Sequence, residues 1–290
     1  MKNSKDLFDE LVSKIRIKED NREIEAIALV ALSESFGITR IQILSGAEIM
    51  WSQEQQEKLD EIVERVNDYE PVQYVIGCTE FFGRQFFVDN SVLIPRPETE
   101  ELVQHLLEDI PSIPREKALR ILDIGTGSGC IPVTIAAELP GVAVMATDVS
   151  EKALTIARKN VVANQVEVQL LMHDILKQPL PFRNLDIVVS NPPYIPHSER
   201  STLNPSVVNY EPHLALFVAD SDPLIFYKAI FEKSAHALSR KGMVMVEIHE
   251  KYGSDVASLL SATGFVNVEI VKDLSGKDRI VKGELAKSST

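Results

Sequence analysis

The feature that most constrains the fold is a regular alternation of short apolar runs and helical patterns after residue 118. The apolar runs are rich in β-branched residues, as is typical of parallel strands buried on both faces. The predicted strands span residues 119–124, 142–146, 166–172, 185–190 and 243–248, and a closing antiparallel pair spans 265–271 and 279–285. Helical patterns fill residues 130–139, 151–164, 223–238 and 250–263. We therefore predict a Rossmann-like α/β domain with a mostly parallel seven-stranded sheet and helices on both faces.

The first seventy residues have a different pattern, which indicates helices without strands between them. Ser52 to Gln55 has the form of a capping box, and an apolar stripe at helical spacing follows it. We predict a small helical bundle over residues 1–72, a β-hairpin linker over 73–94 and the α/β domain over 95–290. The bundle contains no catalytic constellation, so it is either a stability module or a surface on which a macromolecular partner docks.

Composition narrows the class of protein. The chain has 290 residues, is 44% hydrophobic and carries a formal net charge of −13, whereas nucleic-acid binders usually present a basic face. Cys78 and Cys130 are the only cysteines and lack metal-ligand spacing, so we expect no metal site and a reducing, cytoplasmic setting. The sequence shows neither a signal-peptide core nor an apolar run long enough to cross a bilayer.

A glycine-rich stretch joins the strand at 119–124 to the helix that begins at Cys130. Three alternate glycines allow the backbone to pass close to a ligand. A dinucleotide-binding fingerprint would place its third glycine at position 130, where Cys130 stands. The spacing fits instead the Gly-x-Gly-x-Gly loop of S-adenosylmethionine enzymes. The predicted cofactor-binding residues of this loop are Gly125, Thr126, Gly127, Ser128 and Gly129.

Two carboxylates follow the next two predicted strands. Asp148 ends the second strand, where it can accept hydrogen bonds from both ribose hydroxyls. Asp174 ends the third strand within reach of an adenine amino group, and Ile175 can pack on the adenine ring. Simpler roles are also open: Asp148 can cap the following helix, for which Ser150 is the alternative cap, and Asp174 can be an ordinary loop carboxylate.

The strand at 185–190 ends in Asn-Pro-Pro-Tyr, where two prolines stop the hydrogen-bonded ladder. The side-chain oxygen of Asn191 and the Pro192 carbonyl can each accept a hydrogen bond from a planar –NH2 group, and Tyr194 can pack on its flat face. We predict Asn191, Pro192 and Tyr194 as catalytic, Asn191, Pro192, Pro193 and Tyr194 as substrate-binding, and Asn191 as also facing the cofactor. The alternative is a plain turn after a strand. Lacking a strong base or nucleophile, the loop suits the positioning of an attacking nitrogen.

These motifs together resemble the HemK/PrmC family of S-adenosylmethionine-dependent methyltransferases. The resemblance covers residues 71–285 and extends to the helical domain only in size and pattern. It departs at residues 247–250 and 220–222, neither of which we expect on the crevice. The motifs that carry it are Gly-Thr-Gly-Ser-Gly at 125–129, Asp148, Asn-Pro-Pro-Tyr at 191–194, and the stretches 71–77, 94–100 and 210–212.

The resemblance implies that the chain methylates the glutamine side-chain amide in the Gly-Gly-Gln motif of peptide-chain release factors. S-adenosyl-L-methionine is the implied cofactor, held by the 125–129 loop and Asp148, with residues 96–99 closing over it. The helical domain would contact the release factor, and we expect a cytoplasmic monomer without membrane contact. The alternatives are an amino-group methyltransferase acting on adenine or cytosine in DNA or RNA, and a cofactor-binding interaction protein without catalysis.

Overall fold

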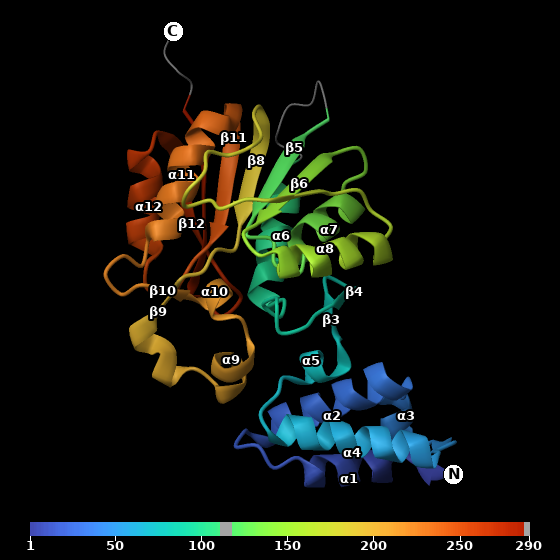
Figure 1. Ribbon diagram of the computed structural model, residues 1–290. Coiled ribbons are helices and arrows are strands. Elements are labelled where there is room, and N and C mark those ends of the chain that lie inside the picture. Colours follow the sequence, from blue (N-terminus) through green and yellow to red (C-terminus); the bar gives the residue numbers. More distant parts are fainter. Residues whose placement is uncertain (111–117, 287–290) are drawn as a thin grey trace. The chain divides into compact units, whose positions relative to one another are not determined.

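The computed structural model describes residues 1–110 and 118–286, and the chain divides into two compact units (Figure 1). The first unit comprises Met1–Cys78 together with Leu203–Tyr210, and the second comprises Thr79–Thr202 together with Glu211–Thr290. The division after Cys78 falls inside the segment 73–94, where we expected a linker. The return of Leu203–Tyr210 to the first unit has no signal in the sequence.

Helices build the first unit. Side chains cap four of them at the N-terminus, and the capping box predicted between Ser52 and Gln55 is present. The unit also contains a two-stranded antiparallel pair, β1 (Lys2–Asn3) with β2 (Glu48–Ile49), which the sequence pattern did not predict. The helices are α1 (Ser4–Lys14), α2 (Asn21–Phe36), α3 (Arg40–Ser45), α4 (Gln53–Asn67), α5 (Val72–Ile76) and α9 (Pro205–Tyr210).

The apolar stripes of these helices form one core. Leu7 and Leu11 of α1 and Leu59 of α4 are each at most 1% exposed, as their helical spacing predicts. The distant segment 203–210 is tied to this unit by the Tyr210 hydroxyl, which lies 2.9 Å from both the backbone carbonyl and a carboxylate oxygen of Asp68. The first unit therefore includes a piece of chain from deep within the second half of the sequence.

A single seven-stranded sheet forms the centre of the second unit. Its strand order is β12-β13-β11-β8-β5-β6-β7, and only β13 runs antiparallel to its neighbours. This arrangement confirms the predicted α/β fold. The strands are β5 (Arg120–Ile124), β6 (Ala143–Asp148), β7 (Gln169–Met172), β8 (Leu185–Ser190), β11 (Leu238–Glu247), β12 (Phe265–Lys272) and β13 (Asp278–Leu285).

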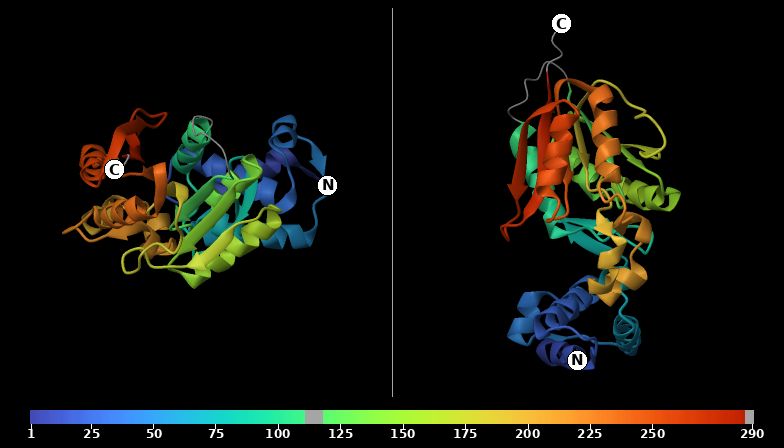
Figure 2. Two further views of the ribbon diagram at one scale, coloured as in Figure 1. Left: turned by 90° about the horizontal axis from the view of Figure 1, so that it is seen from above. Right: turned by 90° about the vertical axis from the view of Figure 1, so that its left-hand side faces the viewer.

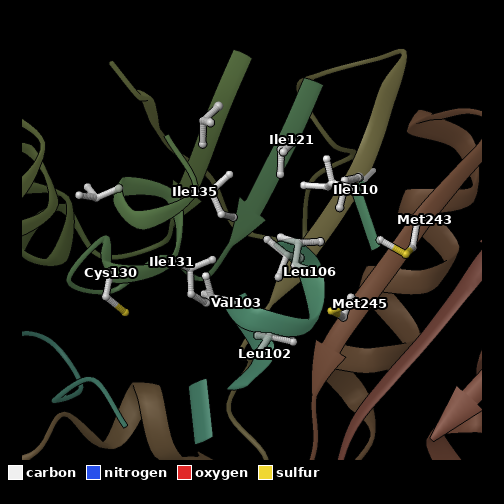
Figure 3. Packing of buried hydrophobic residues seen from close by; sticks show 14 of the residues in the cluster. Leu102, Val103, Leu106, Ile110, Ile121, Cys130, Ile131, Ile135, Met243 and Met245 are labelled. Atoms are coloured by element: carbon white, nitrogen blue, oxygen red, sulfur yellow. The ribbon is translucent and has the colours of Figure 1, made fainter. Parts of the chain in front are cut away.

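Helices cover both faces of this sheet (Figure 2). One core contains α6 (Pro97–Asp109) and α7 (Cys130–Glu138), with α8 (Glu151–Ala163) beside α7. The other contains α11 (Ile225–Ala237) and α12 (Gly253–Ala262). Figure 3 shows Leu102 and Leu106 of α6 among strand residues such as Ile121 and Met245. Burial on both faces explains why the central strands β5, β6 and β8 are largely apolar.

Several small elements complete the second unit. The predicted hairpin forms from β3 (Cys78–Phe81) and β4 (Arg84–Phe87). A parallel pair, β9 (Ile195–Pro196) with β10 (Phe217–Val218), and the short helices η2 (His197–Thr202) and α10 (His213–Leu216) follow the Asn-Pro-Pro-Tyr loop. Among the described residues, no helix combines the length and apolar character needed to cross a membrane.

Candidate active site

A pocket opens at the carboxyl ends of β5, β6, β7 and β8 in the second unit. β6 lies on one side of β5 and β8 on the other, so the order of connections reverses between β5 and β8. Open parallel sheets bind ligands at such a switch point. The pocket holds about 1110 Å³ of space outside the protein atoms, its open mouth included, which is ample for a nucleoside-sized ligand.

The glycine loop forms one wall of this pocket. Gly125 and Gly127 have φ angles of +75° and +53°, which residues other than glycine rarely adopt. A Cβ atom added at either position meets no other atom within 4 Å, so the loop backbone faces open space. The Gly125 and Thr126 amides donate to the Thr147 carbonyl at 2.8 and 3.0 Å. The loop backbone is thus fixed by hydrogen bonds to Thr147 and is accessible to a ligand on its other side.

The third glycine of the motif serves packing. Gly129 has a φ angle of +82° and caps α7 at its N-terminus. A Cβ atom at Gly129 would lie 3.2 Å from the Cβ of Ala157 on α8. Gly129 is not among the residues that line the pocket, whereas the other four predicted loop residues are. The close approach of α7 and α8 therefore accounts for glycine at this position.

Asp148, at the end of β6, is bound to the glycine loop. Its two carboxylate oxygens accept from the Gly127 and Ser150 amides, each at 2.8 Å. Ser150 caps α8 through its side chain, 3.2 Å from the Ala153 amide, so the capping role falls to Ser150. Burial raises the pKa of Asp148, and the backbone hydrogen bonds oppose that shift. Each carboxylate oxygen retains a lone pair with which to accept from a ligand hydroxyl.

Asp123 is a buried acid that the sequence analysis did not single out. It is 0% exposed on β5, and among the described residues neither of its carboxylate oxygens has a hydrogen-bond partner. Burial raises its pKa to about 7, the neighbouring Thr126 hydroxyl opposes that shift, and the negative charge of Asp148 adds to it. A buried carboxylate is costly unless it is paired. Asp123 does not line the pocket itself, but it lies two residues before Gly125, which does, so a cationic group bound at the start of the glycine loop would stabilise its charge.

Asp174 and Ile175 lie beyond β7, where the sequence analysis expected them, and both line the pocket. The Asp174 carboxylate accepts from the Leu176 amide at 2.9 Å and pairs with Lys177 at 2.9 Å. The hydrogen bond from Lys177 lowers the pKa of Asp174. Ile175 is 8% exposed, which suits a surface on which a planar ring packs.

The Asn-Pro-Pro-Tyr loop contributes another part of the pocket wall. Asn191, Pro192 and Pro193 line the pocket. The Asn191 side-chain nitrogen donates to the Thr99 hydroxyl oxygen at 3.0 Å. Its side-chain oxygen is therefore the end of the amide that remains to accept a hydrogen bond from a substrate.

Tyr194 is placed differently from the other three residues of the loop. It does not line the pocket; its hydroxyl donates to the carboxylate of Glu247 at 3.1 Å. The segment 247–250 lies off the pocket wall, as expected, but Glu247 supports that wall from behind. Thr99, which does line the pocket, donates to the second oxygen of Glu247 at 2.6 Å.

An ion pair between a buried carboxylate and a partly exposed arginine holds a second segment at the pocket. Pro95 and Arg96 line it, and the Arg96 guanidinium donates to the Glu211 carboxylate. The Ile94 amide donates to the same carboxylate at 3.3 Å. The Glu211 side chain is only 1% exposed. These contacts bring the stretch 94–99 to the pocket and explain how two motifs distant in the sequence act together.

The supporting acids had a signal in the sequence. Asp123 and Glu247 each interrupt an otherwise apolar strand, Leu122-Asp123-Ile124 and Val246-Glu247-Ile248. A charged residue in a strand buried on both faces needs a partner or a ligand. The apolar pattern predicts both strands as core elements but does not indicate which groups pair with these two acids.

The fold, the glycine loop and the carboxylate after the second strand of the sheet together define an S-adenosylmethionine-dependent methyltransferase. The open glycine backbone and the remaining acceptors of Asp148 fit that cofactor. In the described residues, no group of three or more acidic, histidine or cysteine side chains could hold a metal ion.

Comparison with known proteins identifies the family. Residues 98–209 match the family model for the methyltransferase small domain, and residues 13–77 match that for the PrmC N-terminal domain. The chain is 39% identical over 263 residues to a release factor glutamine methyltransferase of Flavobacterium psychrophilum, covering 91% of this chain and 92% of the relative. It is 38% identical over 271 residues to that of Bacillus subtilis, with coverages of 91% and 92%. The chain belongs to the release factor glutamine methyltransferase family.

Solved structures share the fold. A methyltransferase from Pyrococcus furiosus is 17% identical with a TM-score of 0.51, and the match covers 82% of this chain and 100% of that one. The hMettl16 catalytic domain is 19% identical with a TM-score of 0.54, covering 85% of this chain and 87% of that one. At these identities the likeness speaks for the fold alone.

Proposed function

We propose that this protein methylates the side-chain amide nitrogen of the glutamine in the Gly-Gly-Gln motif of peptide-chain release factors. Family membership supplies the reaction and the class of substrate. The observation that carries the site assignment is the Asn191–Thr99 hydrogen bond, because it leaves the Asn191 oxygen as an acceptor at the pocket. An amide –NH2 group is the kind of nucleophile that such an acceptor binds.

The protein's own residues have two tasks in this reaction. When bound, S-adenosylmethionine supplies an electrophilic methyl group on sulfonium sulfur. The Asn191 side-chain oxygen and the Pro192 carbonyl each accept a hydrogen bond from one N–H of the glutamine amide. These two hydrogen bonds fix the plane of the amide and oppose delocalisation of the nitrogen lone pair. Alignment of a weak nucleophile with its target contributes much of the rate in such sites. The proton can leave after transfer, so no dedicated base is required.

The cofactor side of the pocket is assigned by chemistry. We assign the open backbone of Gly125 and Gly127, with Asp148, to the cofactor's methionine and ribose groups. Asp174 and Ile175 suit the adenine. Tyr194 lies three residues after Asn191 and off the pocket wall, and its hydroxyl donates to Glu247, so we assign it the part of holding the loop in place.

Substrate choice requires more surface than the pocket has. Any planar –NH2 group can satisfy Asn191 and Pro192, so selection of a release factor falls to another part of the chain. The first unit, described over residues 1–78 and 203–210, contributes no residue to the pocket. We assign it the docking of the release factor, and assign the protein as a monomer acting in the cytoplasm, where translation takes place.

The test compares two acceptor proteins. The enzyme, incubated with S-adenosylmethionine carrying a labelled methyl group, should label an intact release factor and should not label one whose Gly-Gly-Gln glutamine is replaced by alanine. Equal labelling of the two factors would show that another residue is the acceptor. Transfer to neither factor, with the cofactor bound, would contradict the proposed substrate.

A further inference from the structure

We infer, on the basis of the proposed function, that Glu247 acts through Thr99 to determine which end of the Asn191 side-chain amide faces the pocket. Glu247 is thus a positioning residue that makes the site accept an amide and reject a carboxylate. The two ends of an asparagine side chain have the same shape and opposite hydrogen-bonding character. Something other than packing must therefore select between them.

The three side chains form a buried chain of hydrogen bonds. Glu247, the last residue of β11, is 1% exposed, and Thr99, in the first turn of α6, is 3% exposed. The distance from the Thr99 hydroxyl oxygen to a Glu247 carboxylate oxygen is 2.6 Å, and that from the Asn191 nitrogen to the Thr99 oxygen is 3.0 Å. The other Glu247 oxygen accepts from Tyr194 at 3.1 Å. Both ends of the carboxylate are therefore engaged.

The hydrogen bond between Thr99 and Glu247 determines the direction of the hydrogen bond between Thr99 and Asn191. An ionised carboxylate only accepts, so the single hydroxyl hydrogen of Thr99 is directed to Glu247. The Thr99 oxygen then has only lone pairs to offer Asn191. Asn191 must meet it with its –NH2 group, and its carbonyl oxygen is left for the substrate. The carboxylate of Glu247 thereby fixes the Asn191 carbonyl oxygen as the hydrogen-bond acceptor at the pocket.

The surroundings of Glu247 bear on its charge. Burial raises the pKa of this carboxyl, and the hydrogen bonds from Thr99 and Tyr194, together with the positive charge of Arg279, oppose that shift. Arg279 is held by Asp273 at 3.1 Å. Glu98, a like charge, acts in the opposite sense. The net shift of the Glu247 pKa is upward. The accepting role of Glu247 therefore rests on geometry, because the Thr99 and Tyr194 hydroxyls each donate to a different oxygen of its carboxylate.

The consequence concerns selectivity. If the Asn191 amide turned over, its –NH2 group would face the –NH2 group of a glutamine, and neither could accept from the other. A glutamate carboxylate would then be the better ligand. Sites built to pair with one polar group reject an analogue that leaves buried groups unpaired. Loss of the Thr99 hydroxyl should therefore reverse part of the preference of glutamine over glutamate.

Two threonine variants isolate the hydroxyl. Thr99→Val keeps the shape and removes the hydrogen bond, whereas Thr99→Ser keeps the hydrogen bond. Thr134→Val on α7 is the matched control, because Thr134 is 0% exposed, lies off the pocket, and its hydroxyl has no partner among the described residues. Glu247→Met removes both acceptor oxygens at similar length, so that the Thr99 hydroxyl is free to donate to Asn191, and it tests the same point if Thr99→Val fails to fold.

The measurements are the turnover number on an intact release factor and the affinity for two forms of that factor, with glutamine or glutamate in the motif. Thr99→Val should lower turnover on the order of 10²-fold and shift the glutamine-to-glutamate affinity ratio about tenfold toward glutamate. Thr134→Val should match the wild type in both, and Thr99→Ser should recover most of the turnover and of the ratio that Thr99→Val loses. Glu247→Met should shift the ratio in the same direction as Thr99→Val.

The outcomes separate this inference from the proposed function. A wild type that does not label the release factor contradicts the proposed function, while the affinity ratio still tests the orientation of Asn191. A wild type that labels the factor, with an unchanged ratio in both Thr99→Val and Glu247→Met, overturns the inference. A loss of turnover without a shift in the ratio also overturns it, because it shows a purely structural effect.

Discussion

At the scale of single residues, Asn191 carries the predicted chemistry because it is the acceptor that the hydrogen-bond network leaves for the substrate. Asn191→Ala removes that acceptor without touching the glycine loop. We expect turnover to fall on the order of 10²-fold or more, as for other preorganised polar contacts at reacting centres, while cofactor affinity stays close to that of the wild type. Steady-state kinetics with calorimetry of cofactor binding checks both, and near-normal turnover would remove Asn191 from the mechanism.

Asp148 is the residue on which cofactor affinity should depend most. Asp148→Ala removes the acceptor offered to the ribose and also frees the Gly127 amide. A hydrogen bond to a charged group contributes roughly 1.5–3 kcal/mol, so affinity for S-adenosylmethionine should fall about tenfold or more. Titration calorimetry measures this directly. Unchanged affinity would limit Asp148 to organising the loop.

Asp123 makes the stability of the cofactor-free protein depend on pH. Its pKa is raised by burial from 3.8 to about 7, so between these values the folded state retains a proton that the unfolded state has lost. Its contribution to stability is therefore lost as pH rises from about 4 to about 7. Asp123→Asn removes this titration. The variant should gain stability relative to the wild type across that range, by on the order of a few kcal/mol.

Denaturant unfolding at several pH values measures this difference, and other titrating groups cancel because both proteins contain them. A difference between variant and wild type that does not change from pH 4 to pH 8 would contradict the assignment. The same variant should bind the cofactor more weakly, since Asp123 would no longer offer a charge to its ammonium group.

The residues that the sequence revealed differ in kind from those that it did not. Asp148 and Asn191 follow strands in a repeating pattern, and the carboxyl ends of parallel strands meet at one edge, so their convergence on one pocket could be predicted. Thr99 and Glu247 lie 148 positions apart and meet only through packing. No local pattern encodes such a pair, although an acid inside an apolar strand signals that a partner exists.

At the scale of elements, the alternation of strands and helices could be predicted because strands buried on both faces require continuous apolar runs in the sequence. The structure of the segment after the Asn-Pro-Pro-Tyr loop could not be predicted. Residues 195–218 form two strands of two residues each and three short helices. Elements this short have too few residues for a period to appear. Their positions are set by contacts such as the Arg96–Glu211 pair.

The Arg96–Glu211 ion pair should determine how firmly the stretch 94–99 is held at the pocket. Glu211→Gln removes the charge that binds Arg96 within a carboxylate site that is 1% exposed. The Arg96 side chain is 34% exposed, so the loss comes mainly from the weaker hydrogen bond that a neutral amide forms with its guanidinium. We expect cofactor affinity to fall about tenfold, the equivalent of ~1.4 kcal/mol, in calorimetric titration. Glu138→Gln, which removes the partner of Arg84 off the pocket, is the control, and equal affinities in the two variants would contradict the assignment.

At the scale of the whole molecule, the division of labour between the two units predicts the effect of truncation. A chain that begins at Thr79 retains every described residue that lines the pocket. It should bind S-adenosylmethionine, which also reports that it has folded. Its activity on an intact release factor should fall more than tenfold, since specificity for a folded partner resides in surface outside the pocket.

Activity on a short Gly-Gly-Gln peptide provides the control for that truncation. The peptide has no surface with which to reach the first unit, so full-length and truncated chains should methylate it at similar low rates. A truncated chain that binds the cofactor and methylates the intact factor as fast as the full chain would show that the first unit has no docking role.

The most direct test of the central claim offers the enzyme a choice of acceptors. S-adenosylmethionine with a labelled methyl group is added to the full chain together with an intact release factor, ribosomal RNA and DNA in one mixture. Mass spectrometry should locate the label on the side-chain amide nitrogen of the glutamine in the Gly-Gly-Gln motif, with none on the nucleic acids. Label on adenine or cytosine amino groups, with an unlabelled release factor, would contradict the account.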